Sequence, residues 1–192
     1  TFTGKILGND KTIENLYINR RDENKVGLIG YARDSKINNL IIESANISGG
    51  KSTAILVGDA GYNVRISGVS VDGRVKGANR TAGVVGNFAD AGIITDTQAT
   101  VNVHGIRFVG GITGFSEFNT TIENSTSISN IEGEQFAIGG LSGRNSGTII
   151  NSTSRSSVKG DYRVGGIAGD LSYGREGFNP EIIGSFSDSS VE

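Results

Sequence analysis

The sequence predicts an all-β protein folded as a parallel β-solenoid (β-helix), with about six coils of roughly 28 residues and an N-terminal partial or capping unit. Three observations support this fold class. A glycine tetrad recurs at a nearly constant spacing, a pair of apolar residues recurs with it, and the residues in between alternate between apolar and polar. We expect the 192 residues to form a single β-solenoid domain in which residues 1–25 are the partial unit.

The glycine tetrad has the form Gly-x-x-Gly with apolar residues between the glycines, and in one copy Ile55 replaces the first glycine. Glycine has no side chain, so it allows tight turns and the close approach of neighbouring sheets. Each tetrad is therefore predicted to mark a corner of one coil. The closing glycines, which lie 26 to 29 residues apart, are Gly30, Gly58, Gly86, Gly114, Gly143 and Gly169.

The second marker is an Ile that precedes a Val or Ile by nine residues, within a segment that alternates apolar and polar residues. Such alternation is typical of a strand with one buried face, and stacked units bury a continuous core. In the later repeats serines occupy the inward positions, where each hydroxyl can bond the backbone or its neighbour. An antiparallel β-sandwich, the alternative architecture, explains frequent turns but not this fixed register. The marker pairs are Ile66/Val75, Ile94/Val103, Ile122/Ile131, Ile149/Val158 and Ile182/Val191, and the inward serines are Ser125, Ser127, Ser129, Ser152, Ser154, Ser156, Ser185, Ser187 and Ser189.

Composition excludes several kinds of site. The chain has no Cys, so thiolate metal sites and disulfides are excluded, and any Ser-His-Asp triad would depend on the single histidine, His104. The 18 basic and 20 acidic residues give a formal net charge of −2, which provides no global attraction for nucleic acid. No apolar run approaches the roughly 20 residues of a membrane span. We therefore expect no catalytic residue, metal, cofactor, nucleic-acid partner or membrane span in this chain.

Two segments, Ile138-Gly-Gly-Leu-Ser-Gly143 and Val164-Gly-Gly-Ile-Ala-Gly169, each lead into Ile-x-x-Ser and then Val. They resemble the GLUG repeat, a family named for its Gly-Leu-x-Gly core. The opening from Phe2 to Arg20 looks like the segment that often begins such arrays, so the resemblance covers nearly the whole chain. It implies an extracellular or cell-surface bacterial protein. Such arrays occur in large surface adhesins and in the non-catalytic region of IgA-specific zinc metalloendopeptidases.

The expected function is that of a non-catalytic repeat segment: an adhesin stalk, a scaffold or a ligand-presenting surface. The chain begins at Thr1 without an initiating Met, so we expect neighbouring domains of a longer parent chain. One alternative is the substrate-holding region of an IgA-specific zinc metalloendopeptidase. A second alternative is a β-helix enzyme that acts on polysaccharides. Its acid pair would be Asp72 and Asp188, but four rungs of about 4.8 Å separate them by roughly 19 Å, beyond the ~5–10 Å of glycosidases.

Aromatic residues provide the candidate ligand contacts, with a host protein or a glycan as the partner. Each follows a closing glycine by no more than nine residues, so we expect them to collect on one edge of the solenoid. Exposed rings there could stack on sugars or anchor a protein, whereas buried rings would pack into the joints between coils. The candidates, together with an arginine from the insertion of the last repeat, are Tyr31, Tyr62, Phe88, Phe115, Phe118, Tyr173, Arg175 and Phe178.

Charged residues are expected to be solvated. By the alternation of its strand, His104 faces outward, and no base and nucleophile can be assembled around it. Glu132 and Glu134 are predicted to be turn charges without a partner. An isolated calcium ion at Asp59 or Asp90 is a further alternative, although the residues after the closing glycines form no ladder of carboxylates.

Overall fold

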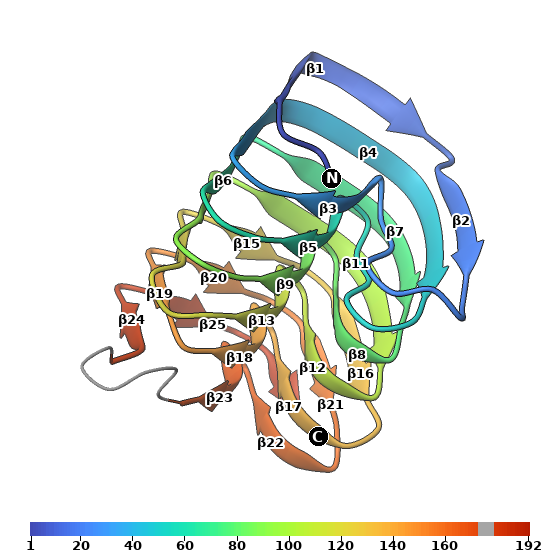
Figure 1. Cartoon of the computed structure of the whole chain (residues 1–192). Helices are drawn as coiled ribbons and strands as arrows, with labels where there is room; N and C mark the ends of the chain where they lie inside the picture. The colour runs from blue at the N-terminus through green and yellow to red at the C-terminus, as the bar shows by residue number, and fades with distance from the viewer. Residues whose placement is uncertain (173–178) are drawn as a thin grey trace.

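The computed structural model, which describes residues 1–172 and 179–192, is an all-β solenoid of about six turns (Figure 1). Parallel strands from successive turns stack on one another roughly 28 residues apart. Successive turns cross a 16-stranded sheet in one, two or three strands and add one strand each to a six-stranded sheet. Four of the turns also add a strand to a four-stranded sheet. The predicted fold class is therefore confirmed.

The 16-stranded sheet, called the wide sheet below, forms one side of the solenoid. Its longest strand, β4, runs along the path that β6 and β7 share in the next turn, and it pairs with both of them. In the first turn, β1 and β2 pair in parallel with β4. The strands of the wide sheet are β1 (Lys5–Glu14), β2 (Tyr17–Arg20), β4 (Ser35–Gly49), β6 (Val64–Ser67), β7 (Ser70–Lys76), β10 (Ile93–Thr95), β11 (Gln98–Gly105), β14 (Thr121–Glu123), β15 (Thr126–Ser127), β16 (Asn130–Gly133), β19 (Thr148–Ile150), β20 (Thr153–Ser154), β21 (Ser157–Lys159), β24 (Glu181–Ile183), β25 (Phe186–Ser187) and β26 (Ser190–Val191).

Two smaller sheets close the other side of the solenoid. From β7 onward, the chain leaves the wide sheet in each turn, adds one strand to the four-stranded sheet, turns, and adds one strand to the six-stranded sheet. In the turn before, β4 leads to β5 without a strand in the four-stranded sheet. The four-stranded sheet contains β8 (Asn79–Ala82), β12 (Arg107–Gly110), β17 (Phe136–Gly139) and β22 (Tyr162–Gly165), and the six-stranded sheet contains β3 (Ile29–Ala32), β5 (Val57–Ala60), β9 (Val85–Phe88), β13 (Thr113–Ser116), β18 (Ser142–Asn145) and β23 (Ala168–Leu171).

The register of the strands matches the sequence markers. Ile66 pairs with Ile94, which pairs with Ile122, and the column continues to Ile182. Val75 and Val103 belong to a second column, which runs from Ile18 to Val191. Ile66, Ile94 and Ile122 are at most 1% exposed, so each turn adds one Ile to a continuous core.

The glycine tetrads lie at the turn between the two smaller sheets, as predicted for corners. A β-carbon on Gly114 would lie 2.6 Å from the carbonyl carbon of Arg80, the amide nitrogen of Thr81 and the carbonyl oxygen of Gly86. All three atoms belong to the backbone, which cannot move aside. The closing glycine thus lets the six-stranded sheet pack directly against the backbone of the four-stranded sheet. Ile55, the variant of the tetrad, is fully buried in the hydrophobic core.

Serine side chains build the core of the later turns, as the alternation predicts. The hydroxyl of Ser127 donates to the Oγ of Ser129 at 2.9 Å, and both residues are at most 5% exposed. The amides of Ser125 and Ser129 donate to the hydroxyl oxygens of Ser152 and Ser156 at 3.1 and 3.2 Å. These amides bond to serine hydroxyls and not to backbone carbonyls of the next turn, so the ladder of backbone hydrogen bonds is interrupted. The single strand β11 is therefore followed in the next turn by two shorter strands, β15 and β16.

Removing one of these hydroxyls should destabilise the protein. Ser156→Ala deletes the acceptor of the Ser129 amide and leaves a buried donor unpaired. We expect the free energy of unfolding to fall by about 1–3 kcal/mol, measured by urea denaturation. The neighbouring Ser157 is exposed, so Ser157→Ala is the matched control, with an expected change within about 0.5 kcal/mol. Equal effects of the two substitutions would contradict the structural role of the serine ladder.

Candidate functional site

A groove of about 760 Å³ lies on the outer face of the wide sheet, over strands β4, β7, β11, β16 and β21. Side chains alternate along a strand, so every second residue of these strands points outward, and parallel register stacks them into columns. Two such columns line the groove. One contains Asn46, Arg74, Asn102, Asn130 and Ser157, and the other contains Ser48, Lys76, His104, Glu132 and Lys159.

The first column carries hydrogen-bonding amides. The side-chain nitrogen of Asn130 donates to the side-chain oxygen of Asn102 at 2.8 Å, which links two successive turns. The remaining amide groups of both side chains make no protein hydrogen bond in the part of the chain that the structure describes. They therefore remain available as donor and acceptor for a ligand.

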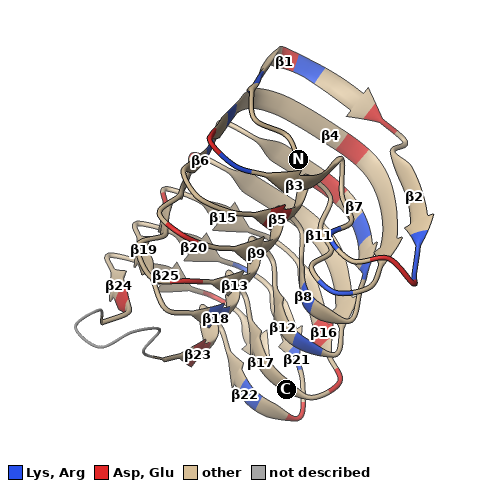
Figure 2. Ribbon diagram, viewed as in Figure 1, with Lys and Arg blue, Asp and Glu red and all other residues tan. Residues whose placement is uncertain are grey.

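The groove is locally basic although the chain as a whole is not. Four basic residues line it, namely Arg21, Arg74, Lys76 and Lys159, against one acidic residue, Glu132. Four positive charges minus one leave +3 within the groove, whereas the whole chain has a formal net charge of −2. None of the four basic side chains forms an ion pair within residues 1–172 and 179–192. Figure 2 shows how Lys and Arg are distributed over these strands.

His104 lies at the rim of the groove between two carboxylates. Its Nε2 is 3.1 Å from Oε1 of Glu134, and its Nδ1 is 3.5 Å from Oε2 of Glu132. The prediction that these glutamates have no partner is wrong, because the turn after β16 brings Glu134 back over the histidine. When the ring is protonated, both of its nitrogens can donate to these carboxylates. The outward position of His104 agrees with the prediction, and its side chain is 34% exposed.

The described residues contain no group of three or more His, Cys, Asp or Glu side chains arranged to hold a metal ion. Asp59, named as a possible calcium ligand, is instead paired within the protein. Its Oδ2 lies 3.0 Å from Nζ of Lys25, and its Oδ1 accepts a hydrogen bond of 3.1 Å from the side chain of Asn87. Within the same ranges, no helix is long and apolar enough to cross a membrane.

The predicted aromatic edge divides into three different environments. Phe88 is 0% exposed, so it belongs to the core, and its assignment as a ligand contact is wrong. Tyr62 is 57% exposed, and Phe118 is half-buried between β13 and β14. Tyr31 and Phe115 both point outward from the six-stranded sheet. The other three candidates, Tyr173, Arg175 and Phe178, lie outside the described residues.

Phe115 belongs to a cluster that the sequence did not reveal. Its ring meets that of Phe108 edge to face at 5.5 Å, and Phe108 meets Phe136 at 5.1 Å. The guanidinium groups of Arg80 and Arg144 lie 4.9 and 5.4 Å from the centre of the Phe115 ring. These half-buried rings and cations contact one another through edge-to-face and cation–π interactions across the corner of the solenoid. The contacts indicate a structural role for the cluster.

Glu117, which follows β13, has a shifted pKa. Partial burial raises the pKa of Glu117 above its ordinary value of 4.5, the nearby Asp90 raises the pKa further, and Arg80 lowers it in part. A raised pKa means that the folded state binds this proton more tightly than the unfolded state. The resulting stabilisation is present at acidic pH and is lost as pH rises from 4.5 through the raised pKa.

Replacing this carboxyl should therefore change the pH dependence of stability. Relative to the natural protein, Glu117→Gln is expected to gain stability at neutral pH and to lose that gain below pH 4.5. Urea unfolding at the two pH values measures the difference, and the exposed Glu14→Gln controls for the loss of one negative charge. If the stability difference between Glu117→Gln and the natural protein were larger in acid than at neutral pH, the direction given for the pKa shift of Glu117 would be wrong.

Similarity to known proteins covers about half of the chain. A segment of halomucin from Haloquadratum walsbyi (strain DSM 16790 / HBSQ001) is 39% identical to this chain over 95 residues, which are 49% of the chain and 1% of halomucin. The chain thus corresponds to a very small part of that curated relative. No family model matches the chain, so the resemblance to the GLUG repeat stays a prediction.

Proposed function

We propose that this chain is a non-catalytic β-solenoid segment of a surface or secreted protein, serving as a stiff scaffold that presents its outer face to a partner. The observation that carries the proposal is the unbroken stack of parallel strands. The six-stranded sheet runs from β3 to β23 with one strand added in each turn. The six strands are separated by five intervals of about 4.8 Å, so they extend roughly 24 Å along the axis.

Rigidity supports the scaffold role. The turns that contain β8 to β22 are bonded to one another through three sheets and the earlier turns through two, and buried side chains form continuous columns between them. The serine ladder adds side-chain hydrogen bonds between turns that are roughly 28 residues apart in sequence. A repeat in such a stack cannot bury its own inner face, so neighbouring turns stabilise one another.

Two similarities support the surface or secreted setting. The first is the match to a segment of halomucin. The second is the resemblance to GLUG arrays, which favours an adhesin as the parent and has the substrate-holding region of an IgA-specific zinc metalloendopeptidase as its alternative. Both the bacterial origin and the role in adhesion remain proposals.

Hydrogen exchange and activity assays test the two parts of the proposal. For a stiff scaffold, the amides of β5, β9, β13 and β18 should exchange as one protected block, whereas exchange turn by turn would contradict rigidity. Incubation with polysaccharides and with IgA should yield no cleavage products. Turnover by the purified chain would overturn the non-catalytic assignment.

A further inference from the structure

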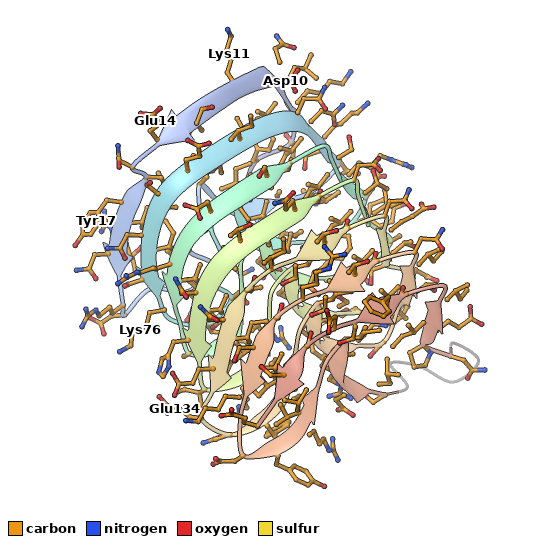
Figure 3. All side chains as sticks on the ribbon, turned by 180° about the vertical axis from the view of Figure 1, so that it is seen from behind. Asp10, Lys11, Glu14, Tyr17, Lys76 and Glu134 are labelled. Atoms are coloured by element: carbon orange, nitrogen blue, oxygen red, sulfur yellow. The ribbon has the colours of Figure 1, made fainter. Side chains whose placement is uncertain are left out.

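We propose that the groove over β4, β7, β11, β16 and β21 binds an acidic polysaccharide through its basic and amide side chains. This proposal goes beyond the scaffold role, which needs no ligand. Figure 3 shows the outer face of the wide sheet from behind, with Lys76 and Glu134 labelled on the same side of the strands and Lys11 at the far end of the sheet.

The groove suits a linear ligand because its lining extends over several successive turns. Its two columns of side chains run along the solenoid axis with a rung spacing of about 4.8 Å. Two adjoining hollows continue it. The first hollow lies at Gly73 and has Arg74 and Asn102 in common with the groove. The second hollow has Asn130 in common with the groove and is also lined by Arg155. A linear chain could therefore contact basic and amide side chains from several turns at once.

The side chains match the two functional groups of an acidic sugar. Arg74, Lys76 and Lys159 can pair with carboxylates, and none of them is neutralised by an ion pair within the described ranges. Asn102 and Asn130 offer donors and acceptors that fit sugar hydroxyls. Asp72, which lines both adjoining hollows, is partly engaged because its Oδ1 accepts a hydrogen bond from the amide of Ser44.

Other classes of partner fit this lining less well. No aromatic side chain lines the groove, so it lacks the rings on which single-stranded nucleic acids stack their bases. Its apolar members, Val75, Val103 and Ile131, are at most 2% exposed and point into the core. The groove therefore also lacks the exposed aromatic anchors that dominate protein–protein interfaces.

The test measures binding of the purified chain to polygalacturonate by calorimetry, at low and at high salt. Dextran serves as the neutral polysaccharide, and poly-L-glutamate serves as a polyanion without sugar hydroxyls. The double variant Arg74→Gln/Lys76→Gln removes two exposed charges from the groove. The matched control, Lys11→Gln, removes an exposed charge from β1, outside the groove.

We expect the natural protein to bind polygalacturonate with an affinity that falls as salt rises, and to bind dextran and poly-L-glutamate much more weakly. The double variant should lose at least about tenfold in affinity, because each charged hydrogen bond contributes severalfold to binding. Asn130→Ala should lose about two- to tenfold. Lys11→Gln should bind as tightly as the natural protein.

Three results would overturn the proposal: no binding of polygalacturonate, equal binding of poly-L-glutamate, or an equal loss of affinity in Lys11→Gln. Failure of binding would leave the scaffold role intact, because hydrogen exchange tests that role separately. Circular dichroism and urea unfolding of each variant show whether the fold is retained, which we expect because all of the replaced side chains are on the surface.

Discussion

Phe88→Ala should lower the free energy of unfolding by about 4 kcal/mol, within the range for truncating a buried Phe. Phe88 is fully buried at the end of β9. Its neighbours in the same column, Ala60 and Ser116, are small, so they cannot fill the cavity that the lost ring would leave. Urea denaturation measures the loss, and hydrogen exchange should place it at β5, β9 and β13.

The matched control is another aromatic residue from the same predicted edge. Tyr62 is 57% exposed, and the backbone oxygen of Tyr62, which accepts the amide of Asp34, survives substitution. Tyr62→Ala should therefore change stability by no more than about 0.5 kcal/mol. Equal stability of the two variants would show that the Phe88 ring does not stabilise the core, contrary to what its burial predicts.

Gly114→Ala should destabilise the protein by about 3 kcal/mol, at the upper end of the usual range for overpacking. The added methyl group would meet backbone atoms of three residues at 2.6 Å, and none of them can rotate away. The steric clash can be relieved only if the two smaller sheets separate at this corner. The thermal unfolding midpoint and the free energy from urea denaturation should both fall.

Gly4→Ala provides the control for this substitution. A β-carbon on Gly4 would meet only the ring of Phe2, at 3.4 Å, which is an ordinary van der Waals distance. We expect a change within about 0.5 kcal/mol. A comparable loss in Gly4→Ala would mean that the cost arises from backbone entropy and not from the close approach of the sheets.

The fold and its register could be predicted because one physical constraint repeats in every turn. A strand buried on one face fixes which residues point inward, and stacking places equivalent residues in one column. The column that contains Ile66 and the hydrogen-bonded serines around Ser127 both follow from that constraint. The tetrads were correctly placed at corners for the same reason, since only glycine fits where two backbones meet.

The predicted aromatic edge fails at Phe88 because distance from the closing glycine does not distinguish inward from outward positions of a strand. Phe115 follows its closing glycine by one residue and points outward, whereas Phe88 follows its closing glycine by two residues and points inward. Alternation within the strand could have separated them. The partners of His104 could not be predicted in this way, since Glu134 lies 30 residues away and reaches the ring through a turn.

The groove could not be predicted from the sequence either. Its lining comes from five strands of successive turns and from Arg21, which lies outside the strands, after β2 in a sixth turn. Each residue in it resembles an ordinary solvated position when it is considered alone. Only the parallel register reveals that basic and amide side chains accumulate on one stretch of the sheet.

The change of core composition along the axis implies that the solenoid is mechanically uneven. One core column changes from Ile42 to Ser127 and Ser154 along the axis. The columns that contain Ile37 and Ile47 stay apolar in every turn. Hydrogen bonds between hydroxyls resist small displacements but release little apolar area when they part. We therefore expect a pull along the axis to separate the turns with serine in this column before the turns with isoleucine there, so that unfolding under force begins on the C-terminal side.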